Sequence, residues 1–344
     1  MSEHKPLGVG IVSTGNWARS FWSDAQHSPD VRLVGCWNRT TERAEKFAEM
    51  YGGVVLPTLE DLVNHPEVEA IINFAANSYH REPTELAAAA GKHVFTDKPI
   101  ANTIEDSVAM IRACEQAGVT LMVGHSSRYA GGPRALKKLL DEGRLGRIAM
   151  AEGNGSHSGG TRVTQERWRY HWQEAPGGPL MQLSVHTFDT LHYLLGPTRR
   201  VTALSNSSLI DSEIEDVFLA LLEFDSGVLA YVGTSYVSPG SNFLRLYGMG
   251  GNAYVEDGKL TLVTTDKEEY WKTQKEESQV PAVSAHLAEM AELARAVRTG
   301  TPPETAGKEG LLALAVVWAC IESSRGGRPV EIEEVLGEAA ALVE

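Results

Sequence analysis

The stretch Leu7-Gly-Val-Gly-Ile-Val-Ser-Thr-Gly-Asn-Trp-Ala18 decides the fold, because it joins an apolar run to a glycine-bearing turn. The run predicts a buried strand, and residues 16–25 follow it as a helix. This order is typical of the first strand, turn and helix of a dinucleotide-binding domain. Gly15 and Ala18 occupy the second and third positions of its Gly-x-Gly-x-x-Gly/Ala fingerprint, whereas Ser13 stands where the first glycine is usual.

Outward from this turn, the first 125 residues alternate between short apolar runs and helical patterns. The apolar runs lie at 31–36, 70–74, 93–96 and 119–123, and the helical patterns at 41–51, 58–64, 79–90 and 103–117. Short apolar strands that alternate with longer helices indicate a parallel, doubly wound sheet. Such a sheet binds its ligand at the carboxyl ends of its strands.

After residue 126 the pattern changes to strand-like runs separated by turn signals. These runs lie at 201–206, 217–224, 229–236, 243–247, 253–256 and 259–264, between helices at 180–195, 286–299 and 307–324. Strands joined by short turns predict an antiparallel sheet. We therefore expect an α/β Rossmann-type dinucleotide-binding domain over residues 1–125. A substrate-binding and oligomerisation domain follows over 126–344, an α+β domain with a large open, mainly antiparallel sheet.

Composition and charge exclude several other classes of protein. The 344 residues carry 31 Lys+Arg against 45 Asp+Glu, a net charge of −14 that disfavours nucleic-acid binding. No run approaches the roughly 18 apolar residues that cross a bilayer, and no secretory signal is evident. Three scattered cysteines fit a cytoplasmic protein without disulfides. His186 and His192 are spaced so that they diverge on a helix, and we expect no metal site.

Asn38 and Arg39 follow the second predicted strand, at the position that selects between nicotinamide cofactors. An acidic residue there accepts hydrogen bonds from ribose hydroxyls and favours NAD, whereas an arginine can hold a 2′-phosphate or stack on adenine. The pair predicts NAD or NADP, with a lean to NADP or dual use. The alternative is that Arg39 is an ordinary surface residue at the end of the strand.

Two motifs lie close together between residues 75 and 101: Ala75-Ala-Asn-Ser-Tyr-His80 and Asp97-Lys-Pro-Ile-Ala101. Here the chain resembles the Gfo/Idh/MocA oxidoreductases, which carry a Pro/Ala-Asn-x-x-His turn and a Glu-Lys-Pro motif at this spacing. Asp97 replaces the usual Glu. The resemblance continues through residues 123–129, 143–148, 177–189, 298–303 and 326–330, and so covers nearly the whole chain.

Lys98 is the first residue expected to take part in the chemistry. It follows a strand at its carboxyl end, where a cationic amine can hydrogen-bond the reacting hydroxyl and stabilise a developing alkoxide. The family resemblance implies the same role, whereas the simpler alternative is a loop lysine before a proline. The motifs together give the expected cofactor-binding residues: Ser13, Gly15, Asn16, Trp17, Asn38, Arg39, Ala75, Asn77, His80, Asp97 and Lys98.

The helix at 180–195 carries one polar stripe, because Gln182, His186, Asp189 and Tyr193 fall within about 40° of one another. Stripe geometry alone favours solvent, but the resemblance implies an Asp-x-x-x-His pair that faces the substrate. Gln182 replaces that Asp and cannot accept a proton at neutral pH, so the general-base role falls to His186. The expected substrate-binding residues are Gln182, Arg128, Trp168, Arg169 and Asp189, and aromatic and guanidinium groups of this kind suit sugars.

These observations lead to an NAD(P)-dependent oxidoreductase that acts on a secondary alcohol of a sugar, polyol or cyclitol. The enzymatic alternatives are a trans-dihydrodiol dehydrogenase-like activity and an oxidation-elimination glycosidase that retains its cofactor. The non-enzymatic alternative is a dinucleotide- or sugar-sensing regulatory protein, which would not need both Lys98 and His186. The resemblance also implies a homodimer or homotetramer, formed by packing the open sheets of two subunits.

Overall fold

The computed structural model describes residues 5–266, 269 and 271–343, and these form two compact units. The first unit extends to Ser126 and also takes in residues 284–311, whereas the second contains residues 127–283 and 312–341. The sequence pattern places the whole of 126–344 in the second domain. Residues 284–311 belong to the first unit instead, because helix α9 (Ala285–Thr299) packs against α1 (Asn16–Ala25) and β2 (Val31–Trp37).

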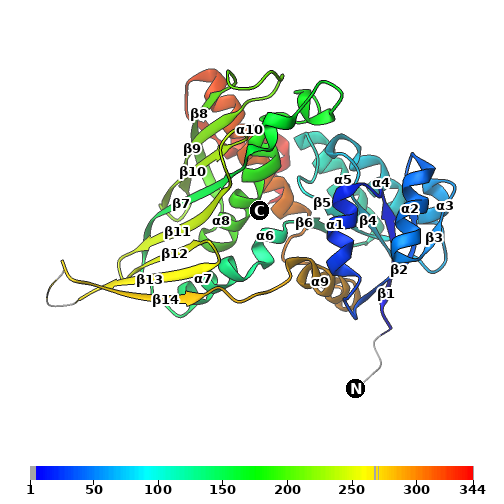
Figure 1. Cartoon of the computed structure of the whole chain (residues 1–344), viewed down its shortest axis with the longest axis horizontal. Helices are drawn as coiled ribbons and strands as arrows, with labels where there is room; N and C mark the ends of the chain where they lie inside the picture. Colours follow the sequence, from blue (N-terminus) through cyan, green and yellow to red (C-terminus); the bar gives the residue numbers. More distant parts are fainter. Residues whose placement is uncertain (1–4, 267–268, 270, 344) are drawn as a thin grey trace. The chain divides into compact units, whose positions relative to one another are not determined.

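The first unit is built on a six-stranded parallel sheet with the order β3-β2-β1-β4-β5-β6. Its strands are β1 (Leu7–Val12), β2, β3 (Val54–Val55), β4 (Ala70–Asn73), β5 (His93–Asp97) and β6 (Leu121–Gly124). Helices α1, α2 (Thr41–Tyr51), α3 (Leu59–Val63), α4 (Arg81–Ala89) and α5 (Ile104–Ala117) connect them (Figure 1). The order reverses between β1 and β4, so the residues after these two strands flank the position where such sheets bind ligands.

The second unit contains a nine-stranded sheet with the order β14-β13-β12-β11-β7-β10-β9-β8-β15. Its strands are β7 (Ile148–Ser156), β8 (Thr198–Asn206), β9 (Val217–Phe224), β10 (Leu229–Ser235), β11 (Ser241–Gly248), β12 (Asn252–Glu256), β13 (Lys259–Thr265), β14 (Thr273–Gln279) and β15 (Val330–Glu331). All neighbouring strands run antiparallel except β7 and β10.

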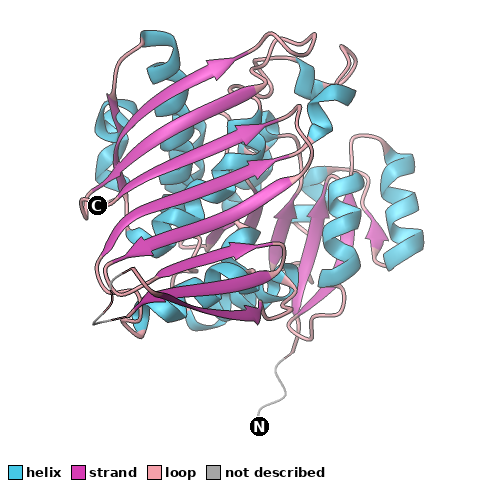
Figure 2. Cartoon of the chain, turned by 60° about the vertical axis from the view of Figure 1, so that its left-hand side comes forward, coloured by secondary structure: helices cyan, strands magenta, loops and turns pink. Residues whose placement is uncertain are grey.

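Helices cover one face of this sheet and leave the other bare (Figure 2). The covering elements are α6 (Ser126–Tyr129), α7 (Gly131–Asp141), the π-helix Leu180–Ser184, α8 (Val185–Leu195) and α10 (Gly307–Gly326). Because side chains alternate between the faces, β9 buries every second residue, and β10 does so over its first four residues. The expected fold class, a Rossmann-type domain joined to a domain with a largely antiparallel sheet, is confirmed.

Three further features bear on function. Within the described residues, no helix combines the length and apolar character that a membrane span requires. The same residues contain no cluster of three or more His, Cys, Asp or Glu side chains arranged to hold a metal ion. Cys36, Cys114 and Cys320 are buried free thiols, and burial raises the pKa of each.

Candidate functional site

The turn after β1 has the geometry that a dinucleotide fingerprint requires. Ser13 has φ +69°, in the left-handed region that favours glycine, which is why glycine is usual at this position. Its N–H donates to the Trp37 carbonyl at 2.9 Å and ties the turn to β2. Gly15 caps the N-terminus of α1, and a Cβ on it would meet no atom within 4 Å. Backbone can therefore approach a pyrophosphate here. Asn16 beside it is exposed and accepts a hydrogen bond from Arg19 at 2.7 Å.

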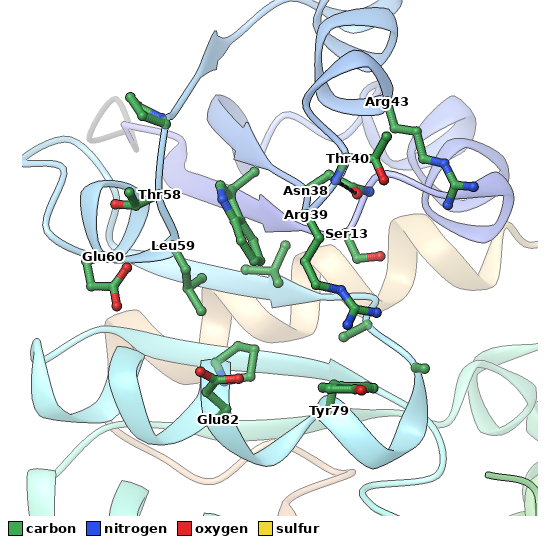
Figure 3. Close-up of a pocket in the computed structure, with 16 residues that line it drawn as sticks. Ser13, Asn38, Arg39, Thr40, Arg43, Thr58, Leu59, Glu60, Tyr79 and Glu82 are labelled. Atoms are coloured by element: carbon green, nitrogen blue, oxygen red, sulfur yellow. Dashed lines mark hydrogen bonds between the residues drawn. The ribbon is translucent and has the colours of Figure 1, made fainter. Parts of the chain in front are cut away.

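A pocket of about 400 Å³ opens beside this turn. Of the residues expected to bind cofactor, Ser13, Asn38, Arg39 and Ala75 line it. Other residues that line the pocket were not expected from the sequence, and they include Thr40, Arg43, Thr58, Leu59, Glu60, Tyr79 and Glu82 (Figure 3). The sequence spacing could have indicated Arg43, because it is a second basic residue about one helical turn after Arg39.

Asn38 and Arg39 take different roles in this pocket. The Asn38 amide donates to Thr14 Oγ1 at 3.2 Å and its oxygen accepts from the Thr40 N–H at 2.9 Å, so it shapes the turn after β2. The Arg39 guanidinium lies 4.5 Å from the centre of the Tyr79 ring. Arg39 and Arg43 thus provide two cationic groups in a pocket that Glu60 and Glu82 also line.

His80 is fully buried and ties two loops together. Its Nδ1 lies 3.0 Å from the Pro99 carbonyl and 3.1 Å from that of Ile100, and its Nε2 lies 3.0 Å from the Ala75 carbonyl. We expected His80 to contact the cofactor. In the structure it instead holds the segment that follows Lys98, because all of its polar atoms are engaged by these backbone groups.

The burial of His80 leads to a pH-dependent stability. Burial lowers the pKa of His80 below the ordinary histidine value of about 6.5, although the charge of Asp97 opposes this shift. The unfolded chain therefore binds a proton that the folded chain does not. Stability is therefore present above pH 6.5 and falls as the pH drops below it, by at most about 1.4 kcal/mol per pH unit. His80→Asn should flatten the dependence of the unfolding free energy between pH 7 and 6, measured by denaturant titration.

His27→Asn is the matched control, because His27 is exposed and its replacement should leave this slope unchanged. Asp97 has the opposite effect on stability. Its pKa is raised above 3.8 in the folded chain, so its contribution to the free energy of unfolding declines as the pH rises from 3.8 through the folded-state pKa. If the unfolding free energy of His80→Asn changed with pH as steeply as that of the wild-type protein, His80 would not be the source of this pH dependence.

The Asp97-Lys98-Pro99 motif lies at the carboxyl end of β5 and contacts the first turn of α1. Loss of water raises the pKa of Asp97, while Lys98, His80 and a hydrogen bond from Trp17 oppose that rise. Trp17 therefore links the cofactor turn to this motif. The Lys98–Pro99 peptide is cis. Asn77 is 6% exposed, and its amide nitrogen has no hydrogen-bond partner in the described part of the chain, as expected of a donor that awaits a ligand.

In the second unit, three members of the polar stripe each meet an arginine. Gln182 accepts a hydrogen bond from Arg169 Nε at 3.3 Å, and Tyr193 accepts one from Arg134 at 2.7 Å. Arg128 donates to the two Asp189 carboxylate oxygens at 3.0 and 2.6 Å. The stripe is thus mostly covered by α6, α7 and the loop before α8, rather than by solvent.

Arg128 and Asp189, both expected to bind substrate, are partners of each other in the structure. The two side chains are only 6% and 0% exposed, and each satisfies the other. They anchor α8 to α6 and do not line the cavity described next. Trp168 and Arg169 contact each other outside this cavity, with the guanidinium 4.2 Å from the centre of the indole ring.

His186 lines a cavity of about 580 Å³ inside the second unit. Its other polar lining residues include Ser156, His157, Thr187, Thr190, Ser241, Asn242 and Glu256. Phe243, Leu183 and Val255 add apolar surface. Hydroxyl, amide and imidazole groups beside an aromatic ring can bind both the hydroxyl edges and the apolar faces of a small polyhydroxylated molecule.

Comparison with known proteins identifies the family. Residues 7–125 match the family model described as "Oxidoreductase family, NAD-binding Rossmann fold", and residues 137–332 match "Oxidoreductase family, C-terminal alpha/beta domain". The chain belongs to the Gfo/Idh/MocA family of oxidoreductases. It is therefore an enzyme of the oxidoreductase class with a domain for a nicotinamide cofactor, and the first-unit residues described above fit that cofactor.

Individual relatives resemble the chain over nearly its whole length. The 1,5-anhydro-D-fructose reductase of Ensifer adhaerens is 30% identical, over 94% of this chain and 98% of its own. The myo-inositol 2-dehydrogenase of Thermotoga maritima is 25% identical, over 96% and 100%. A solved structure from Desulfitobacterium hafniense, described as a candidate NADPH-dependent oxidoreductase, is 31% identical with a TM-score of 0.93, over 97% and 99%.

Proposed function

We propose that the enzyme transfers hydride between NADP(H), or NAD(H) as a second cofactor, and a secondary alcohol or ketone of a sugar, polyol or cyclitol. The observation that carries this proposal is the cavity lined by His186 together with hydroxyl and amide side chains. The relatives named above, a reductase of an anhydro sugar and a dehydrogenase of an inositol, support the same substrate class.

The proposed chemistry assigns one role to each residue. A nicotinamide cofactor held by the first-unit pocket would supply the hydride acceptor for oxidation of the alcohol and the hydride donor for reduction of the ketone. Lys98 donates a hydrogen bond to the reacting oxygen and stabilises its negative charge. His186 takes the hydroxyl proton as the carbonyl forms, and returns it in the reverse direction.

Absorbance at 340 nm provides the test, with sugars, inositols and dihydrodiols each assayed with NAD and NADP. We expect turnover with a sugar or cyclitol. Turnover with dihydrodiols alone would instead favour the dihydrodiol dehydrogenase-like activity. If every substrate were inert while cofactor binding persisted, a retained-cofactor glycosidase or a sensor would replace this proposal.

Cofactor preference should depend on the two arginines of the first-unit pocket. Arg39→Gln combined with Arg43→Gln should raise the KM for NADP at least about 10-fold, because two charged hydrogen-bond donors to the 2′-phosphate are lost. The KM for NAD should change less than about 3-fold. Arg112→Gln, on helix α5 outside this pocket, is the control. If the double variant raised the KM for NADP and the KM for NAD equally, the two arginines would not bind the 2′-phosphate.

We also propose that the bare face of the nine-stranded sheet joins two copies of the chain. Six large apolar residues are exposed there: Met150, Leu204, Leu219, Leu221, Leu229 and Tyr231. Cross-strand pairing places Leu204 beside Leu219, Leu221 beside Tyr231 and Leu229 beside Met150, so they form one continuous patch. Continuous patches of this kind mark association surfaces.

Leu221→Lys should therefore dissociate the oligomer, because it places a charge within the patch. Light scattering coupled to gel filtration should change from a multiple of 37.3 kDa to the single-chain mass. Leu209→Lys is the control, because Leu209 is equally exposed but lies in the loop after β8, outside the patch. A wild-type protein that is already monomeric would refute the proposal.

A further inference from the structure

Arg169 is one of the arginines that have no acidic partner among the described residues. Many others pair with a carboxylate, as Arg32 does with Glu67 at 2.7 Å and Arg325 with Glu215 at 3.6 Å. Among the described residues, no carboxylate lies within 4.0 Å of the Arg169 guanidinium, although the chain carries a net charge of −14. Its positive charge is therefore not neutralised by an adjacent acid.

The Arg169 side chain is exposed, and two contacts orient it. Its Nε donates to Gln182 Oε1 at 3.3 Å, and its guanidinium stacks on the Trp168 ring at 4.2 Å. Gln182 is only 7% exposed. Neither Nη group of Arg169 donates to an acceptor among the described residues, so this edge of the guanidinium is left for a ligand. A guanidinium oriented in this way matches the two oxygens of a carboxylate.

Gln182 explains why this charge is available. An acid at position 182 would pair with Arg169 and neutralise it, whereas the amide orients Nε and leaves the charge intact. Gln182 also lies four residues before His186, at a spacing that puts the two on one side of their helical segment. An anion held by Arg169 would therefore lie on the side of this segment that carries His186, although neither Arg169 nor Gln182 lines the cavity beside His186.

We propose that the substrate is an anionic sugar whose carboxylate is bound by Arg169. This inference rests on the proposed function, and it narrows the substrate class from sugars in general to sugar acids. Trp168 fixes the plane of the guanidinium, and Gln182 selects for a carboxylate by remaining neutral.

Matched substrate pairs test the inference: D-glucuronate against D-glucose, and D-galacturonate against D-galactose, assayed with saturating cofactor. The carboxylate member should have the higher kcat/KM, by at least about 10-fold. Arg169→Gln should remove this preference by lowering kcat/KM for the acid alone. Gln182→Glu should remove it as well, because the new carboxylate would occupy the guanidinium. Arg162→Gln is the matched control, an exposed arginine of the same loop, and it should retain the preference.

A binding measurement separates this inference from the proposed function. Titration of the cofactor-loaded enzyme with glucuronate, followed by tryptophan fluorescence, does not require turnover. Glucuronate binding that is lost in Arg169→Gln, without turnover of any sugar, would retain the carboxylate site and refute the oxidoreductase proposal. Turnover of neutral sugars at equal rates in the wild-type enzyme and Arg169→Gln, without a preference for acids, would retain the proposed function and refute the carboxylate site.

Discussion

Lys98→Met should lower kcat at least about 100-fold while the dissociation constant of the nicotinamide cofactor stays within about 3-fold. The expected loss is large because the proposed hydrogen bond strengthens as negative charge develops on the reacting oxygen. Methionine keeps the length and apolar stem of the side chain but removes both the charge and the donor. Steady-state kinetics with the preferred substrate would be combined with cofactor binding followed by fluorescence.

Lys92→Met provides a control at the opposite end of β5. Lys92 directly precedes β5, whereas Lys98 follows it, and its amine donates to the Val68 carbonyl at 2.7 Å. Its loss should leave kcat within about 3-fold, because the group has only a structural partner. If Lys98→Met retained a near-normal kcat, Lys98 would be a loop residue without a role in the chemistry, and the oxidoreductase proposal would need another electrophile.

Local sequence patterns predicted the fold because helices and strands impose different periods on apolar residues. The β1–α1 turn was recognisable even with Ser13 in place of glycine, since the strand before it and the helix after it were clear. The return of residues 284–311 to the first unit was not predictable in this way. Helical periodicity shows that α9 has an apolar face but does not show which sheet that face packs against.

The candidate site was predictable only where residues lie close together in the sequence. Arg39 was found because it directly follows a strand, whereas Tyr79 reaches the same pocket from another loop. The polar stripe of 182–193 was also found, but sequence spacing could not show which partners cover it. Asp189 pairs with a residue 61 positions away, and such long-range pairs are set by packing between elements.

The Arg128–Asp189 pair should be the most sensitive ion pair to single substitution. Asp189→Ala should lower the free energy of unfolding by about 3–5 kcal/mol, because it leaves the buried guanidinium of Arg128 without its carboxylate. For a unit of this size, that corresponds to a fall in Tm of roughly 6–20 °C, measured by calorimetry. Glu67→Ala, which breaks the exposed pair with Arg32, should leave Tm essentially unchanged.

The double variant Arg128→Met with Asp189→Leu distinguishes loss of an ion pair from loss of packing. Apolar side chains of similar volume remove both charges together, so most of the lost stability should return. Asp189 lies three residues after His186 on α8, and the pair therefore anchors the helix that carries the proposed base. If the double variant were as unstable as Asp189→Ala, the shape of these side chains rather than their charge would hold α8 in place.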